Sequence, residues 1–177
     1  MSFKLNPFTS LPDVVRPRLR WGSFYSTQDQ VATSANVDYS ITLNNTDADS
    51  DGVSIVSNSR VTFATGGVYS VTYSVQLANS DTQIHDVNIW LRKNDSGTSG
   101  DLAATDSKFS VIASHGGISG YVIGCVNYVL KLAANDYLEL IWSTTNVAAY
   151  LDYSAASGSG PAHPSVPSVI LTAVQVA

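Results

Sequence analysis

A regular alternation of side chains before Leu77 constrains the fold more than any other feature of the sequence. After the pair Gly66-Gly67, mostly small polar residues alternate with large apolar ones. The large residues are Tyr69, Val71, Tyr73, Val75 and Leu77. Successive side chains of a β-strand point to opposite faces, so the pattern predicts a strand with one apolar face. That face needs a second sheet to cover it.

Similar short segments recur along the chain, separated by Gly, Asn, Asp and Ser. The expected strands are 23–26, 37–43, 53–56, 60–63, 68–77, 86–93, 108–113, 121–132, 137–143, 150–153 and 168–176. Many short strands without a competing helical period predict an all-β fold, an antiparallel β-sandwich of the jelly-roll type. Because residues 168–176 are almost uniformly apolar, we expect this strand in mid-sheet, beside the strand of residues 23–26.

The chain has 177 residues, enough for one domain that buries its core without disulfides. The single cysteine, Cys125, lies in the apolar run YVIGCVNYVL, so we expect it to be buried. The sequence contains no run of eighteen apolar residues, so we expect no membrane span. It also contains no charged segment followed by an apolar one at its start, so we expect no signal peptide.

Charge is distributed unevenly between the first 22 residues and the rest of the chain. The first 22 contain four basic residues and one acidic residue, a net +3, whereas the remainder contains five basic and thirteen acidic residues, a net −8. An acidic body repels phosphate, which argues against nucleic acid as its partner.

Residues 1–22 contain three of the six prolines and many large apolar side chains. Proline fixes φ and removes a hydrogen-bond donor, so we expect an extended arm that buries its side chains against another protein. The domain proper then spans residues 23–177. The expected anchoring residues are Phe3, Leu5, Pro7, Phe8, Leu11, Val14, Val15, Arg16, Arg18 and Arg20.

Two motifs resemble the jelly rolls of the C1q and tumour-necrosis-factor families. They are Phe63-x3-Gly67-x-Tyr69-x-Val71 and Leu132-x3-Asp136-x-Leu138-x-Leu140. Asn135 stands where those families have Gly, and Asn also accepts the positive φ of such a turn. The resemblance covers residues 23–177 and implies a C1q/TNF-like jelly roll.

Longer phrases, among them SNSRVTFATGGVYSVTYSVQL and YLELIWSTTN, resemble C1q-like structural proteins of tailed bacteriophages. The head of the chain, FKLNPFT, is similar to a short leader of phage fibre and head-surface proteins. This resemblance implies a homotrimer on the virion surface that is attached by its N-terminal segment. No heptads or G-X-Y repeats form a shaft between the arm and the head, which favours a subunit lying directly on the particle.

The resulting hypothesis is a capsid decoration, or cement, protein whose partners are two further copies of itself and a major capsid protein or another virion protein. One alternative is a short tail or head fibre that grips a host receptor through loops 94–100, 114–120 and 154–167. The other is an envelope-degrading enzyme, which the sequence disfavours because it contains no G-x-S-x-G elbow and no obvious carboxylate pair.

Aromatic side chains are the candidates for the trimer interface. Trp90 has the opposite parity to Val87, Ile89 and Leu91, so it leaves the face that they bury. Packing in the chain's own core is the competing interpretation for the others. The complete candidate set is Tyr69, Tyr73, Trp90, Tyr128 and Trp142.

Asp47, Asp49, Asp51 and Gly52 match the first half of an EF-hand loop, which makes calcium a weak candidate. The twelfth position is Asn58, which lacks the bidentate carboxylate, and an exposed acidic loop is the simpler interpretation. The three histidines lack metal-ligand spacing, so we expect no other cofactor.

Overall fold

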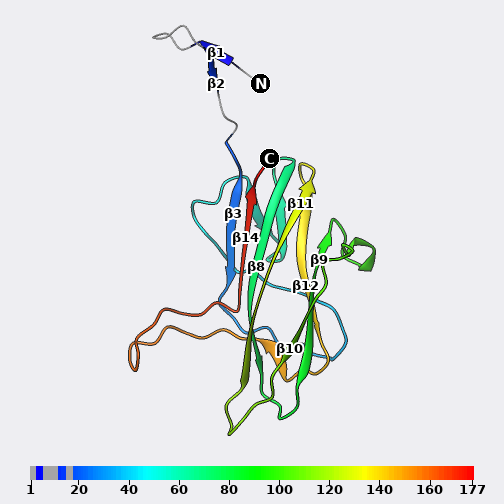
Figure 1. Cartoon of the computed structure of the whole chain (residues 1–177), viewed down its shortest axis with the longest axis vertical. Coiled ribbons are helices and arrows are strands. Elements are labelled where there is room, and N and C mark those ends of the chain that lie inside the picture. Colours follow the sequence, from blue (N-terminus) through cyan, green and yellow to red (C-terminus); the bar gives the residue numbers. More distant parts are fainter. Residues whose placement is uncertain (1–2, 6–11, 15–17) are drawn as a thin grey trace.

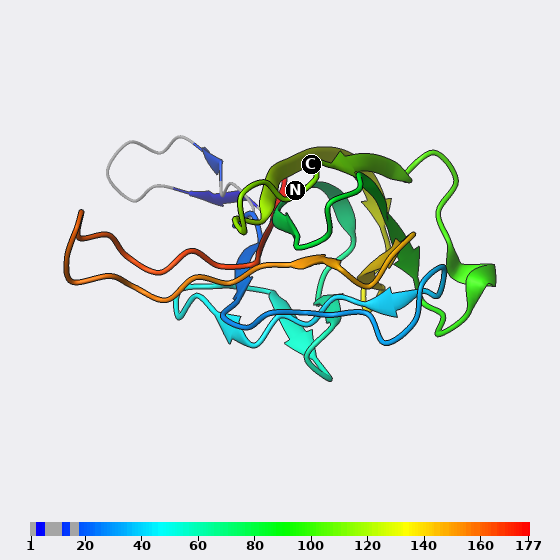
Figure 2. The same ribbon diagram turned by 90° about the horizontal axis from the view of Figure 1, so that it is seen from below.

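The computed structural model describes residues 3–5, 12–14 and 18–177. Two antiparallel sheets stack face to face in a β-sandwich (Figures 1 and 2). The strands of the sandwich are β3 (Trp21–Ser26), β4 (Tyr39–Ser40), β5 (Asn45–Thr46), β6 (Val53–Val56), β7 (Arg60–Phe63), β8 (Gly67–Asn79), β9 (His85–Lys93), β10 (Ser107–Val111), β11 (Gly120–Leu132), β12 (Tyr137–Thr144), β13 (Ala149–Leu151) and β14 (Val169–Gln175).

Strands that are distant in sequence lie next to one another in both sheets. The first sheet has the order β11-β8-β14-β3-β5, with β13 also pairing with β8. The second has the order β10-β9-β12-β7-β6, with β4 also pairing with β12. A 3-10 turn, η1 (Thr98–Gly100), follows β9. The antiparallel sandwich predicted from the sequence is confirmed.

The alternation in β8 has the predicted consequence. Its large apolar residues, Tyr69 to Leu77, are completely buried, and the residues between them lie on the outer face of the sheet. From the second sheet, Phe63 packs edge-on against Tyr69 with ring centroids 4.7 Å apart. Burial of such side chains stabilises the fold by about 1.5 to 3 kcal/mol each, so the core explains why the two sheets stay together.

The last strand lies in mid-sheet, as expected. β14 pairs with β8 on one side and with β3 on the other. Residue 177 and the start of β3 therefore lie at the same pole, where Val68 N donates to Ala177 O. At the other end of β14, the long loop 154–167 projects from the body (Figures 1 and 2).

Three details differ from the sequence-based expectations. β3 begins at Trp21, so the sandwich includes two residues that were assigned to the arm. Within the predicted strand 37–43 only residues 39–40 form β4, and Val37 is exposed because it precedes the pairing with β12. Cys125 is exposed rather than buried, because its side chain points to the outer face of β11.

Two further strands, β1 (Phe3–Leu5) and β2 (Pro12–Val14), pair with each other and form a two-stranded antiparallel sheet. Within the described residues there is no helix of the length and apolarity needed to cross a bilayer.

Candidate functional site

The outer surfaces of the two sheets carry very different amounts of charge. Strands β3, β8, β11 and β14 contain one charged residue between them, Lys131. The second sheet instead carries charge on several strands, including Asp86 and Arg92 of β9, Lys108 of β10 and Glu139 of β12. In a body with a net charge of −8, four adjacent strands without a carboxylate form a distinct surface.

We call the outward-facing residues of these four strands the low-charge face. Backbone pairing places its residues in rows across the sheet. From β11 through β8 and β14 to β3, the rows are Cys125–Ser74–Ile170–Tyr25, Asn127–Thr72–Thr172–Ser23 and Val129–Ser70–Val174–Trp21.

Apolar side chains on both sides of this face are open to solvent. On β11, Tyr121, Ile123 and Val129 are 55 %, 67 % and 64 % exposed. On β14, Ile170 and Val174 are also exposed. Between them β8 contributes small hydroxyl residues, so the face has two apolar ridges and a shallow polar strip. An exposed apolar surface of this kind is typical of an interaction site.

The strip is ordered by hydrogen bonds within the sheet. Asn127 Nδ2 donates to Ser70 Oγ at 2.8 Å and to Thr72 Oγ1 at 2.6 Å. These bonds engage the side chains of Asn127, Ser70 and Thr72 within the sheet, which lowers the desolvation cost of covering these three residues.

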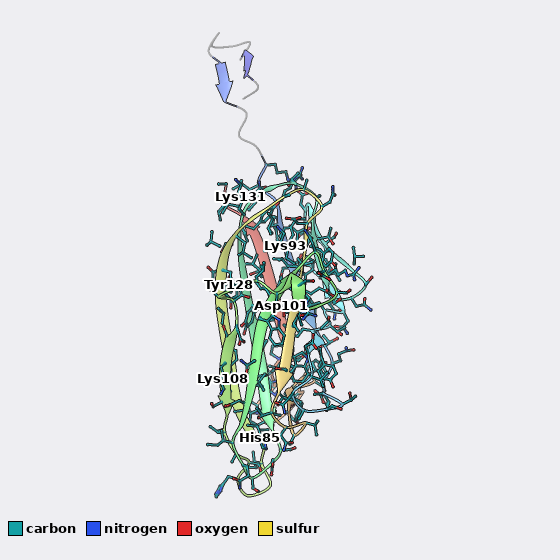
Figure 3. The ribbon with its side chains drawn as sticks, turned by 90° about the vertical axis from the view of Figure 1, so that its right-hand side faces the viewer. His85, Lys93, Asp101, Lys108, Tyr128 and Lys131 are labelled. Carbon is teal, nitrogen blue, oxygen red and sulfur yellow. The ribbon has the colours of Figure 1, made fainter. Side chains whose placement is uncertain are left out.

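The low-charge face ends at an unprotected strand edge. In the described part of the chain, β11 pairs only with β8. It is 13 residues long and contains neither proline nor a carboxylate. Long apolar edge strands are open to pairing with other chains, and proteins normally cover or charge them. Figure 3 shows this edge with Tyr128 and Lys131 labelled.

Most aromatic candidates for the trimer interface serve the chain's own core. Tyr69, Tyr73 and Trp142 are buried and have no free surface to offer another subunit. Tyr128 is half-buried on the inner side of β11, where its hydroxyl donates to Thr105 O at 2.6 Å. Trp90 leaves the buried face of β9, as its parity predicts, but it lies on the second sheet, away from the low-charge face.

The anchoring residues divide into two groups. Phe3, Leu5 and Val14 lie in β1 and β2, and Arg18 and Arg20 contact the sandwich. Arg20 Nη1 donates to both carboxylate oxygens of Asp51 at 2.9 and 2.8 Å, and Arg18 Nε lies 3.0 Å from Asp51 Oδ2. The residues that lie outside the described ones are Pro7, Phe8, Leu11, Val15 and Arg16.

The same ion pairs involve Asp51, one of the three residues of the weak calcium candidate. Asp51 is engaged by two arginines, and Asp47 Oδ1 accepts a hydrogen bond from Asp49 N at 3.0 Å. Among the described residues no group of three or more acidic, histidine or cysteine side chains could hold a metal ion. His85 Nε2 instead lies 2.7 Å from Asp81 Oδ2 at the start of β9.

Sequence reasoning missed the low-charge face because both parities of residues 121–132 are largely apolar. The sequence feature that could have indicated this face is the shortage of charged residues in the four segments that form β3, β8, β11 and β14. No known family model matches the chain, and comparison with curated proteins finds no significant match.

Proposed function

We propose that this chain is a homotrimeric structural protein of a tailed-phage virion, a capsid decoration protein held to the particle by its N-terminal segment. The observation that carries the proposal is the low-charge face, which ends at the free edge of β11. Its partners are two further copies of the chain and a major capsid protein or another virion protein.

Self-association is favoured by charge and by shape. Between two acidic bodies, contact costs least where each copy lacks carboxylates, and the low-charge face is that surface. The face also offers complementary relief, because the ridge of Ile123 and Val129 can lie in the shallow strip of Ser70 and Thr72 on a neighbour. Covering it removes exposed apolar area and protects the edge of β11.

The strand order supports a jelly roll of the C1q/TNF type. Strands β7, β9, β10 and β12 lie in the second sheet and β8 and β11 lie in the first, so the chain crosses between the sheets repeatedly, and β14 returns to the first sheet between β3 and β8. Asn135, which stands in place of the usual Gly of the family motif, has φ 65°, as expected for that turn. The threefold assembly and the phage particle come from the family resemblance.

The attachment segment is best taken as residues 1–17. Arg18 and Arg20 bind Asp51 of the body, and Arg20 N donates to Gln175 Oε1 at 3.1 Å. Removing these two residues would disturb the sandwich itself. Deletion of residues 2–17 therefore separates anchoring from folding more cleanly than a longer truncation.

Sedimentation equilibrium tests the assembly. We expect each protein to sediment with three times the mass of its own chain, which is 18.8 kDa for the full-length protein and correspondingly less for the 2–17 deletion. On particles, immuno-electron microscopy should place the full-length chain on the head, and the deletion variant should be absent. A monomer in solution, or attachment of the deletion variant at the normal level, would refute the corresponding half of the proposal.

A receptor-binding fibre remains the second candidate because the loop 154–167 projects from the body. Labelling of the tail tip together with binding of the purified domain to host cells would favour it. An envelope-degrading enzyme needs a carboxylic acid that is protonated near neutral pH. Burial raises the pKa of Asp101, which lies beside Asp106 in the hollow described below, but the hydrogen bond from Arg92 Nε and the charge of Arg92 help to outweigh burial, so this pKa is instead below its usual value.

A further inference from the structure

An open hollow of about 490 Å³ lies on the outer face of the second sheet, away from the low-charge face. Its floor comes from Asn88 and Trp90 of β9 and Ser143 of β12, and its wall comes from the loop 101–106. Pairing of β9 with β12 sets Asn88 directly opposite Ser143. Figure 3 shows Asp101 over these strands. A volume of this size is typical of small-molecule sites.

The wall of the hollow is held firmly in place by Thr105, which is 4 % exposed. Its hydroxyl donates to Leu102 O at 2.8 Å and accepts a bond from Leu91 N at 3.1 Å. Its carbonyl accepts a bond from the Tyr128 hydroxyl at 2.6 Å. The loop is thus tied both to β9 and to the opposite sheet, so the hollow is preformed.

Two locally unfavourable features lie at this hollow. Ala104 has φ 62°, a left-handed conformation that costs a non-glycine residue about 1 to 2 kcal/mol. The Trp90 Nε1–H is covered and has no hydrogen-bond partner among the described residues, although Asp101 lies close to it. Such features persist where the surrounding structure enforces them, and they are concentrated at functional sites.

Acceptors and an apolar surface converge in the hollow. Asp101 is held ionised by Arg92 Nε at 2.7 Å, and Arg92, which is buried, also binds Asp38 at 2.9 Å. Asp106 is exposed and accepts a bond from Asn88 Nδ2 at 2.8 Å. The Trp90 ring, Leu102 and the two alanines supply apolar contact.

We propose that this hollow binds a neutral saccharide ring. A pyranose offers an apolar face of C–H groups to an indole, while its hydroxyl rim donates to carboxylates and amides. One aromatic ring is too few for a cage around a quaternary cation. The excess of carboxylates around the hollow disfavours acidic sugars. The site does not depend on the trimer or on the virion, because every lining residue comes from one chain.

Indole N–H resonances in ¹H–¹⁵N spectra provide a direct test, because the chain has three tryptophans and therefore three such signals. Trp90→Phe identifies the signal of Trp90. The probes are methyl glucoside, methyl galactoside and N-acetylglucosamine, each to about 50 mM, well above a millimolar Kd. Galacturonate and agmatine are the anionic and cationic probes. We expect at least one neutral probe to shift the Trp90 signal saturably, leaving those of Trp21 and Trp142 in place.

Asp106→Asn supplies the matched variant, because the side chain is exposed and its loss leaves the Arg92 ion pairs intact. It should weaken binding by about tenfold or more, as expected for the loss of a charged hydrogen-bond acceptor. Asp49→Asn, an exposed carboxylate elsewhere, should leave the affinity unchanged. Absence of a Trp90 shift with all three neutral probes, a shift with agmatine alone, or equal affinity of Asp106→Asn and the wild type would overturn the proposal. None of these outcomes depends on the oligomeric state.

Discussion

The carboxylate of Asp136 joins the start of β12 to two neighbouring segments. It accepts hydrogen bonds from Asn94 Nδ2 at 2.6 Å and Ala133 N at 2.8 Å, and Lys93 Nζ lies 2.7 Å away. Burial opposes its ionisation, but these partners outweigh burial and lower the pKa of Asp136. A carboxyl with a lowered pKa stabilises the fold above its unfolded-state pKa, and this contribution is lost as the pH falls.

We therefore predict that Asp136→Asn lowers the free energy of unfolding by about 2 to 3 kcal/mol at pH 7. The difference from the wild type should begin to shrink below about pH 4, where the carboxyl of the unfolded chain becomes protonated, and it should disappear as the pH falls through the lower pKa of the folded state. Urea denaturation across this pH range measures both effects. Asp49→Asn, on an exposed side chain, should change stability by less than about 0.5 kcal/mol. An equal loss at pH 3 and pH 7 would contradict the assigned role.

Asn135 occupies the turn before β12 with φ 65°. Asn135→Gly should be nearly neutral, whereas Asn135→Val should destabilise the protein by about 1 to 2 kcal/mol, because a β-branched residue is strained in the left-handed region. Thermal unfolding of the two variants makes the comparison. Equal melting temperatures would show that the turn adjusts its backbone.

Turn chemistry made Asn135 predictable from the sequence, because few residue types accept positive φ. Cys125 was not predictable in this way. Its neighbours are apolar at both parities, so the sequence gives no sign of which set faces the core. Only the fold, which turns the odd-numbered side chains of β11 to the outer face of its sheet, explains the exposure.

At the scale of elements, β11 carries the proposed assembly. Val129→Asp places a carboxylate on the β11 edge of the low-charge face, and we predict a folded monomer in sedimentation experiments. Val129 is exposed in the single chain, so the substitution should leave the free energy of unfolding of the monomer unchanged. Val56→Asp on β6 is the matched control, because Val56 is an exposed valine on the opposite sheet. Association that survives Val129→Asp would exclude this face.

Cys125 gives an independent measure of the same contact. Its thiol is exposed in one chain and lies in the row with Ser74 and Ile170. In the assembled protein we expect slow reaction with a thiol reagent, and in the Val129→Asp variant we expect rapid reaction. Equally fast alkylation of both proteins would mean that the face stays open to solvent.

The strands themselves were largely predictable, because period-two patterns such as the one in β8 follow from packing on one face. Which strands lie next to one another in the sheets was less predictable. The low-charge face combines β3, β8, β11 and β14, which are spread over the whole chain, and the hollow depends on a loop anchored across both sheets. Such long-range arrangements leave little trace in local periodicity.

For the whole molecule, the net charge determines how association responds to salt. Each body carries a net −8, and the proposed interface contains no carboxylate. Salt should then screen the repulsion between copies without breaking ion pairs between them. We predict tighter association in about 500 mM than in about 50 mM NaCl, measured by sedimentation equilibrium. Dissociation at the higher concentration would indicate an interface held by opposite charges.

The central position of β14 also affects biosynthesis. On the ribosome, β3 emerges early, yet its main neighbour is made last, and Arg20 meets Gln175 across 155 positions. At about 5 to 20 residues per second, β3 waits for roughly 7 to 30 seconds before its sheet can close. Nascent chains therefore cannot present a finished surface to one another, and copies meet only after translation has passed residue 175.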